Sequence, residues 1–233
     1  MWYNVRVKTY PDGHKQYFYS ENKMFRWDDV PEEWRPQKIK RKFSPPKDGR
    51  YSRSLRRAVN EVYDIARSNH FDWFITLTLS PEAVDRTNYD ECAAAIVLFT
   101  KRLRRNGNQY VIVPELHHDG KSYHFHGLVQ GDLDLTHWKG EVYNLNNFEF
   151  GYTTAMRIQD PNRVATYIAK YLTKDIAVPK GRKCYWASRS LARPTVEYKE
   201  ISEAEFLFDI WAPARYTKEI DAGEYGRFVL AEE

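Results

Sequence analysis

The chain has 233 residues and a formal net charge of +4, and 42% of its residues are hydrophobic, which is enough for one domain of ordinary to large size. No run of about 18 apolar residues occurs, so a membrane-spanning helix is excluded, and the first residues lack the basic and apolar pattern of a signal peptide. The two cysteines, Cys92 and Cys184, stand in unrelated contexts, which argues against a disulfide framework and favours a reducing compartment such as the cytoplasm.

Residues 1–50 are predicted to form a small hairpin followed by a basic arm. Strand-like residues around Pro11-Asp12-Gly13 predict a hairpin within residues 4–20. Ten lysines or arginines but a single acid, Asp48, lie between Arg35 and Arg57. Such a run either contacts nucleic-acid phosphates or is a solvated linker, and both interpretations stay open.

A helix and a strand are expected next. Apolar residues at helical spacing predict a helix over Ser52–Asn69. A β-rich run over residues 71–79 predicts a strand that Ser80-Pro81 ends.

A second helix is expected over about Tyr89–Arg105. Thr87 or Asn88 can cap its start, and Gly107 follows its end. Its last turn is basic, which complements the helix dipole and can also face phosphates.

The stretch from Gln109 to Gln130 is predicted to be a hairpin, because two β-rich runs flank the Asp119-Gly120 turn. Alternation along the second strand places His124, His126 and Leu128 on one face.

Two imidazoles side by side form half of a metal site, and Glu115, near the end of the first strand, can supply an anionic third ligand. The alternative is that the histidines only form hydrogen bonds. His117 and His118 are expected to decorate the turn.

Residues 131–147 show no clear period and are predicted to be a loop or a short helix around Trp138, followed by one or two strands within 148–158. A helix is then expected over Asp160–Lys174. Its apolar side collects Ala165, Ile168, Ala169, Leu172 and Ile176, and its opposite side collects Tyr167, Lys170, Tyr171 and Lys174.

The remaining chain begins with a basic and aromatic stretch, residues 180–193, which has five cations, no acid, and the pair Tyr185-Trp186. A strand at 195–198 and a short helix at about 202–209 follow. The expected organisation is therefore a hairpin and basic arm over 1–50, a main domain over 51–200, and a C-terminal extension over 201–233.

Three features stand in a fixed order: the strand Phe74-Ile-Thr-Leu-Thr-Leu-Ser80, the His-hydrophobe-His strand at 124–126, and Val164-x-x-Tyr167-x-x-Lys170 on a helix. In this order they resemble the three motifs of the HUH endonucleases, the rolling-circle replication initiators of small phages and plasmids. The resemblance covers roughly residues 71–175. The flanks at 54–60 and 185–194 look like those of phage-type replication-associated proteins from bacteria.

The resemblance implies an α+β fold with a central antiparallel sheet and flanking helices, packed mainly on one side, as in ferredoxin-like and RNA-recognition domains. The expected enzyme is a nickase and strand transferase acting on single-stranded or hairpin origin DNA. A tyrosine oxygen attacks a phosphodiester, forms a 5′-phosphotyrosine and frees a 3′-hydroxyl, and the adduct later allows strands to be rejoined.

The resemblance also assigns the roles. Tyr167 would be the nucleophile, Lys170 would stabilise developing charge, and Tyr171 would be either a second nucleophile or a packing residue. Glu115, His124 and His126 would hold Mn²⁺ or Mg²⁺. The candidate DNA-binding residues are Lys40, Arg41, Lys42, Arg53, Arg56, Arg57, Lys174, Arg182, Lys183, Tyr185 and Trp186.

Two other classes remain. An HUH relaxase or tyrosine transposase would share the histidines and the nucleophile, although relaxases often place the tyrosine before the His motif. A non-catalytic nucleic-acid-binding module would need only the basic and aromatic content. No Walker A motif is present, so unwinding would require a separate helicase. The sequence does not indicate the oligomeric state.

Overall fold

The computed structural model describes residues 1–26, 33, 53–172, 178–179, 181–223 and 226–233. Contacts group the chain into two compact units, residues 1–44 with 193–233 and residues 45–192. This grouping joins the two ends of the chain, which the expected division into consecutive segments kept apart.

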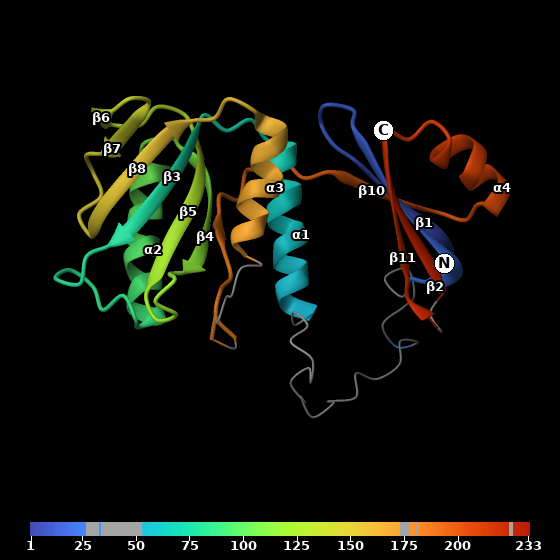
Figure 1. The fold of residues 1–233 in the computed structure, drawn as a ribbon, viewed down its shortest axis with the longest axis horizontal. Helices are drawn as coiled ribbons and strands as arrows, with labels where there is room; N and C mark the ends of the chain where they lie inside the picture. Colours follow the sequence, from blue (N-terminus) through green and yellow to red (C-terminus); the bar gives the residue numbers. More distant parts are fainter. Residues whose placement is uncertain (27–32, 34–52, 173–177, 180, 224–225) are drawn as a thin grey trace. The chain divides into compact units, whose positions relative to one another are not determined.

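The unit of residues 45–192 is built on a seven-stranded sheet with strand order β6-β7-β8-β3-β5-β4-β9, and the described strand pairs are antiparallel (Figure 1). Its strands are β3 (Trp73–Leu79), β4 (Gln109–Leu116), β5 (Tyr123–Gln130), β6 (Leu135–Lys139), β7 (Val142–Leu145), β8 (Gly151–Arg157) and β9 (Trp186–Ala187). Its helices are α1 (Arg53–Ser68), α2 (Tyr89–Arg105) and α3 (Pro161–Tyr171).

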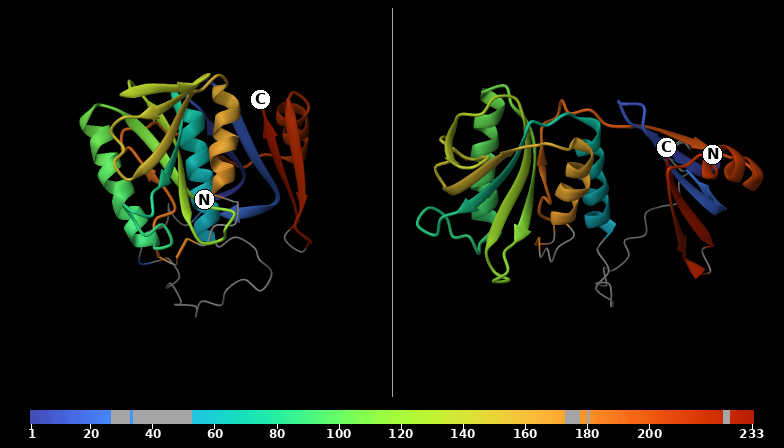
Figure 2. Two further views of the ribbon diagram at one scale, coloured as in Figure 1. Left: turned by 60° about the vertical axis from the view of Figure 1, so that its left-hand side comes forward. Right: turned by 45° about the horizontal axis from the view of Figure 1, so that its top comes forward.

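Helices cover both faces of this sheet (Figures 1 and 2). Helix α2 packs on the face that carries Ile75 and Phe125, whereas α1 and α3 pack together on the face that carries Val111 and Leu128. This arrangement differs from the expectation of helices mainly on one side. The reason lies in the central strands, which are apolar at successive positions and therefore present two faces that must be buried.

The helix and turn signals of this unit are confirmed. Asn88 caps α2, since its side-chain oxygen accepts a hydrogen bond from the Asp90 N–H at 3.1 Å. Gly107 follows the helix with φ of 80°. In the turn of the β4–β5 hairpin, Asp119 accepts hydrogen bonds from the backbone N–H groups of Lys121 and Ser122, each at 2.8 Å.

The prediction for residues 131–147 is wrong, because this segment forms the β6–β7 hairpin rather than a loop or a short helix. Strands β6 and β7 have 5 and 4 residues, and four of the five residues of β6 are exposed. So short a strand at the edge of a sheet has no buried face to impose an alternating pattern on its sequence.

The unit of residues 1–44 and 193–233 contains a five-stranded sheet of order β10-β1-β2-β12-β11. Its elements are β1 (Trp2–Thr9), β2 (Lys15–Phe25), β10 (Thr195–Lys199), α4 (Glu203–Glu205), η2 (Phe206–Trp211), β11 (Tyr216–Asp221) and β12 (Arg227–Glu232). The N-terminal hairpin is confirmed, and the C-terminal residues add β11 and β12 to it. Phe206 of η2 stacks on Tyr19 with ring centroids 4.0 Å apart, in a core that includes Val5 and Val229.

The α+β class with antiparallel sheets and flanking helices is thus confirmed. Within the described residues, no helix combines the length and the apolar character needed to cross a bilayer.

Candidate active site

The two histidines of β5 lie on one face of the sheet, as their alternation predicts. Strand register pairs His124 with Glu115 of β4, and His126 with Thr76 of β3. Residues paired across antiparallel strands share a face. The side chains of these four residues therefore project on the side of the sheet that α1 and α3 cover, whereas Phe125 between the histidines packs on the α2 side.

His126 is held by a hydrogen bond at each ring nitrogen. Its Nε2 lies 2.7 Å from Oε2 of Glu115, and its Nδ1 lies 3.2 Å from Oγ1 of Thr76. A carboxylate only accepts hydrogen bonds, so in the neutral imidazole Nε2 carries the hydrogen and Nδ1 accepts from the Thr76 hydroxyl. The ring is 7% exposed, and these two contacts fix its plane.

The two tyrosines of α3 reach this histidine. The Tyr171 ring stacks on the His126 ring with centroids 3.8 Å apart and planes 21° apart. The Tyr171 hydroxyl donates a hydrogen bond to the Tyr167 hydroxyl at 2.6 Å. Phe74 of β3 packs beside all three rings, with centroid distances of 5.3 Å to Tyr167 and 5.7 Å to His126. The three sequence motifs therefore converge on one place in the fold.

The phase of α3 explains this placement. Ala165, Ile168 and Leu172 are buried against the sheet and α1, as predicted from their spacing. Tyr167 is 50% exposed on the other side, and Tyr171 is half-buried next to it. Two side chains four residues apart on a helix are neighbours, so one helix face presents both phenols.

The two phenols have different environments. Burial raises the pKa of Tyr171, and its hydrogen bond with Tyr167 and the nearby Glu115 carboxylate act in the same direction. Tyr171 therefore stays protonated at neutral pH and acts as a hydrogen-bond donor. The exposed hydroxyl that receives this hydrogen bond is that of Tyr167.

His124 lies against the turn rather than against His126. Its ring centroid is 4.4 Å from that of His117, so His117 is nearer to the histidine pair than a turn position indicates. Burial lowers the pKa of His124 to about 4, and the neighbouring His117 and His126 add to this effect, while Glu115 opposes it. His124 is consequently neutral at pH 7 and keeps a nitrogen lone pair available to a ligand.

The donor chemistry of this site fits a divalent cation, since Glu115, His124 and His126 offer one carboxylate and two imidazoles on adjacent strands. Glu115 and the Nε2 atom of His126 are directed at each other. His124 does not complete the set, and no group of three His, Cys, Asp or Glu side chains within the described part of the chain is arranged to hold a metal ion. A cation here would replace the hydrogen bond between Glu115 and His126.

The remaining predicted site residues are more scattered. Lys170 is exposed on α3 near the tyrosines. Arg56 and Arg57 are exposed on α1, Arg182 pairs with Asp90 at 2.6 Å, and Lys183 is exposed. Tyr185 is half-buried, and Trp186 is 5% exposed and packs against Phe125, so its ring has little free surface for a base. Lys40, Arg41, Lys42 and Lys174, as well as the side chain of Arg53, lie outside the described residues.

Three residues of the site were not singled out from the sequence. Thr76 and Phe74 contact His126 and the tyrosines, and both belong to one face of β3, which alternation along that strand could have indicated. Tyr152 of β8 is 75% exposed and pairs with Thr78, which pairs with His124 on the same row of the sheet. An aromatic residue on a strand face carries no sequence signal of exposure, so Tyr152 required the structure.

Comparison with known proteins places this site within a family match. No curated protein and no solved structure matches the chain. Residues 72–176, which contain β3, the histidines, Glu115 and both tyrosines, match the family model of replication-associated proteins of the ORF2 type, and this match supports a replication-initiator family for the chain.

Proposed function

We propose that the protein is a rolling-circle replication initiator that nicks single-stranded or hairpin origin DNA by tyrosine attack, with a divalent cation as cofactor. The observation that carries the proposal is the convergence of Tyr167 and Tyr171 on His126, which is itself bonded to Glu115. The family match over residues 72–176 supports the replication role and a DNA partner.

Tyr167 is the proposed nucleophile. Its hydroxyl is exposed and accepts a hydrogen bond from Tyr171, which stabilises the oxygen anion that attacks the phosphorus. The bond between the Tyr167 oxygen and phosphorus forms while the bond from phosphorus to the 3′ oxygen breaks. The departing oxygen takes up a proton, equivalent to the one that Tyr167 gave up to solvent, and becomes a 3′-hydroxyl.

The other residues position and stabilise the reacting groups. Glu115, His126 and His124 would hold Mn²⁺ or Mg²⁺, which when bound would polarise the scissile phosphate and offset its developing charge. Thr76 orients His126 through Nδ1, which is the role that second-layer partners of metal ligands play. Lys170, one turn from Tyr167, supplies a positive charge for the phosphate.

The test is a search for a covalent protein–DNA adduct. The protein is incubated with labelled single-stranded oligonucleotides that cover candidate origins, in the presence of Mn²⁺, Mg²⁺ or EDTA, and separated under denaturing conditions. We expect a metal-dependent adduct that Tyr167→Phe abolishes while DNA binding persists, since only one oxygen is removed. Adduct formation at the wild-type rate in Tyr167→Phe, mapped to another residue by mass spectrometry, would overturn the assignment.

One observation favours a second candidate, a nucleic-acid-binding module without catalysis. Glu115 and His126 already satisfy each other, and the described residues contain no preformed three-residue ligand group. The same experiment separates the two functions. A binding module would retain DNA but form no adduct with any metal, and Glu115→Gln would leave DNA binding unchanged.

A further inference from the structure

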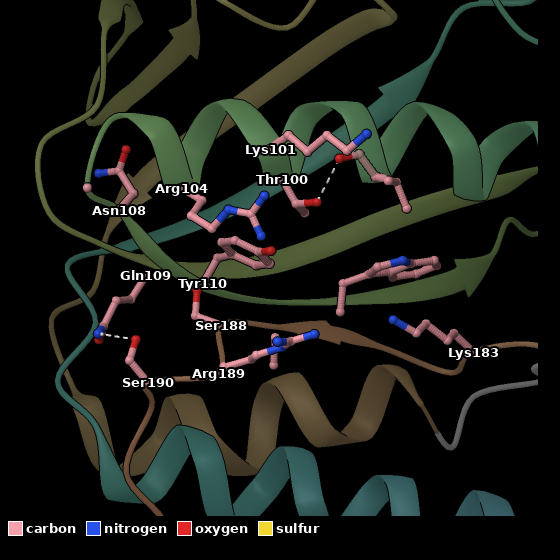
Figure 3. Close-up of a pocket in the computed structure, with 14 residues that line it drawn as sticks. Thr100, Lys101, Arg104, Asn108, Gln109, Tyr110, Lys183, Ser188, Arg189 and Ser190 are labelled. Atoms are coloured by element: carbon pink, nitrogen blue, oxygen red, sulfur yellow. Dashed lines mark hydrogen bonds between the residues drawn. The ribbon is translucent and has the colours of Figure 1, made fainter.

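A groove lies between α2 and the segment 183–190, on the opposite face of the sheet from the tyrosines. It encloses about 590 Å³, and Tyr110 of β4 lines its floor (Figure 3). The side of the sheet follows from the register, because Trp186 of β9 pairs with Ile112, which packs against α2. The groove thus occupies the β9 edge of the sheet.

The groove is strongly cationic. Lys101 and Arg104 line it from the last turns of α2, and Lys183 and Arg189 line it from the facing segment. Figure 3 shows Arg104 extending from α2 toward the segment that carries Arg189. All four side chains are exposed, the lining contains no Asp or Glu, and none of the four forms an ion pair with another described residue. Four cations this close repel one another unless an anion lies between them.

Hydrogen bonds hold the two walls in place. The Tyr89 hydroxyl of α2 donates to the carbonyl of Lys183. Further along, the Ser188 N–H donates to the Tyr110 carbonyl at 2.9 Å, and Gln109 donates to the Ser190 hydroxyl at 2.8 Å. The backbone that carries Lys183 and Arg189 is therefore tied to α2 and β4, so part of the cost of ordering these cations on a ligand is already met.

A second hollow continues the groove along α2. It encloses about 550 Å³ and shares Val97, Lys183 and Trp186 with the first. Its lining is mainly apolar, and on α2 Val97 is 37% and Leu98 46% exposed. Apolar surface beside a group of unpaired cations suits a ligand that carries phosphates and flat bases together.

We propose that this groove binds a segment of single-stranded DNA, with phosphates on the four cations and bases toward the apolar hollow. The volume is in the range of sites that take a molecule of nucleotide size, which a duplex cannot enter with its paired bases. The inference rests on the proposed function for the identity of the nucleic acid. A strand that occupied both the groove and the tyrosine site would pass round the β9 edge of the sheet.

The test compares charge-matched variants of the full-length protein by fluorescence anisotropy with labelled single-stranded DNA over a range of salt concentrations. Lys101→Gln combined with Arg104→Gln removes two charges from the groove. Arg105→Gln combined with Lys139→Gln removes two exposed charges outside it, one from α2 and one from β6 at the other edge of the sheet. All four positions are exposed, so neither double variant should alter folding.

We expect the groove variant to lower the slope of log K against log salt by about 1.4, which is roughly 0.7 for each lost contact to a single strand. The control variant should keep the wild-type slope. Equal slopes in the two double variants would overturn the proposal. Unlabelled duplex, a deoxynucleoside triphosphate and inorganic phosphate serve as competitors. Displacement by duplex as effectively as by single strands, or by the free nucleotide at a lower concentration, would also overturn it.

The adduct assay keeps this result separate from the proposed function. If the groove variant alone loses single-strand affinity while no substrate yields an adduct, the groove stands and the nicking function fails. If adducts form normally and the two double variants bind alike, the nicking function stands and the groove assignment fails.

Discussion

The hydrogen bond between the two tyrosines makes a quantitative prediction for Tyr171→Phe. The substitution removes one oxygen, keeps the ring that stacks on His126 at 3.8 Å, and leaves the Tyr167 oxygen without its 2.6 Å donor. A hydrogen bond to a charged group contributes about 1.5–3 kcal/mol. Because Tyr167 is 50% exposed and water can replace part of the contact, the lower end applies. A loss of about 1.5 kcal/mol in the transition state corresponds to a roughly tenfold slower first nick.

The assay is single-turnover formation of the covalent adduct with enzyme in excess over DNA, so that product release does not limit the rate. Tyr152→Phe is the matched control, because it also removes one phenol oxygen on the same face of the sheet and leaves the tyrosine pair intact. A wild-type rate in Tyr171→Phe would refute a role for the hydrogen bond. Complete loss of the adduct in Tyr171→Phe, with adduct retained in Tyr167→Phe, would show that Tyr171 is the nucleophile.

Three further predictions concern the histidines. His124→Ala should weaken Mn²⁺ binding in calorimetric titration, while His117→Ala should not; equal losses would reject the ligand assignment. Thr76→Val should weaken metal binding or nicking by about 10- to 100-fold because His126 loses the contact that orients it, and Thr78→Val is the control for which no such loss is expected. The depressed pKa of His124, about 4 against an ordinary 6.5, means that the unfolded chain binds more protons between these values. Stability should therefore fall as the pH drops through this window, and denaturant titrations should show a smaller fall in His124→Gln.

The sequence predicted those parts of the site that depend on local periodicity. Alternation along one strand placed His124 and His126 on one face, and helical spacing placed Tyr167 and Tyr171 opposite the buried side of α3. Both patterns follow from the requirement that one face of a strand or helix be buried, and this requirement acts within a few residues.

Contacts between distant segments could not be derived in the same way. The stacking of Tyr171 on His126 depends on which face of the sheet α3 packs against, and the apolar residues of the central strands allowed either face. The pairing of β12 with β2 joins residues at opposite ends of the chain, and no local pattern specifies such a partner. The same limit applies to the groove, whose cations come from two stretches that are separate in the sequence.

The arrangement of the site also bears on the two roles left open for Tyr171. A residue that alternates with Tyr167 as nucleophile must at some stage expose its oxygen and lose its proton. In the described state Tyr171 is half-buried against His126, burial raises the pKa of its phenol, and its hydroxyl donates to Tyr167. These features suit a residue that supports Tyr167 during the first nick. A nucleophilic role for Tyr171 in a later strand transfer would require its ring to leave His126, or the Glu115 carboxylate to be neutralised by a bound cation, since that carboxylate helps to keep the phenol protonated. Strand transfer from a preformed adduct should then respond to metal concentration more steeply in the wild type than in Tyr171→Phe, and an identical response in the two proteins would leave Tyr171 with the supporting role alone.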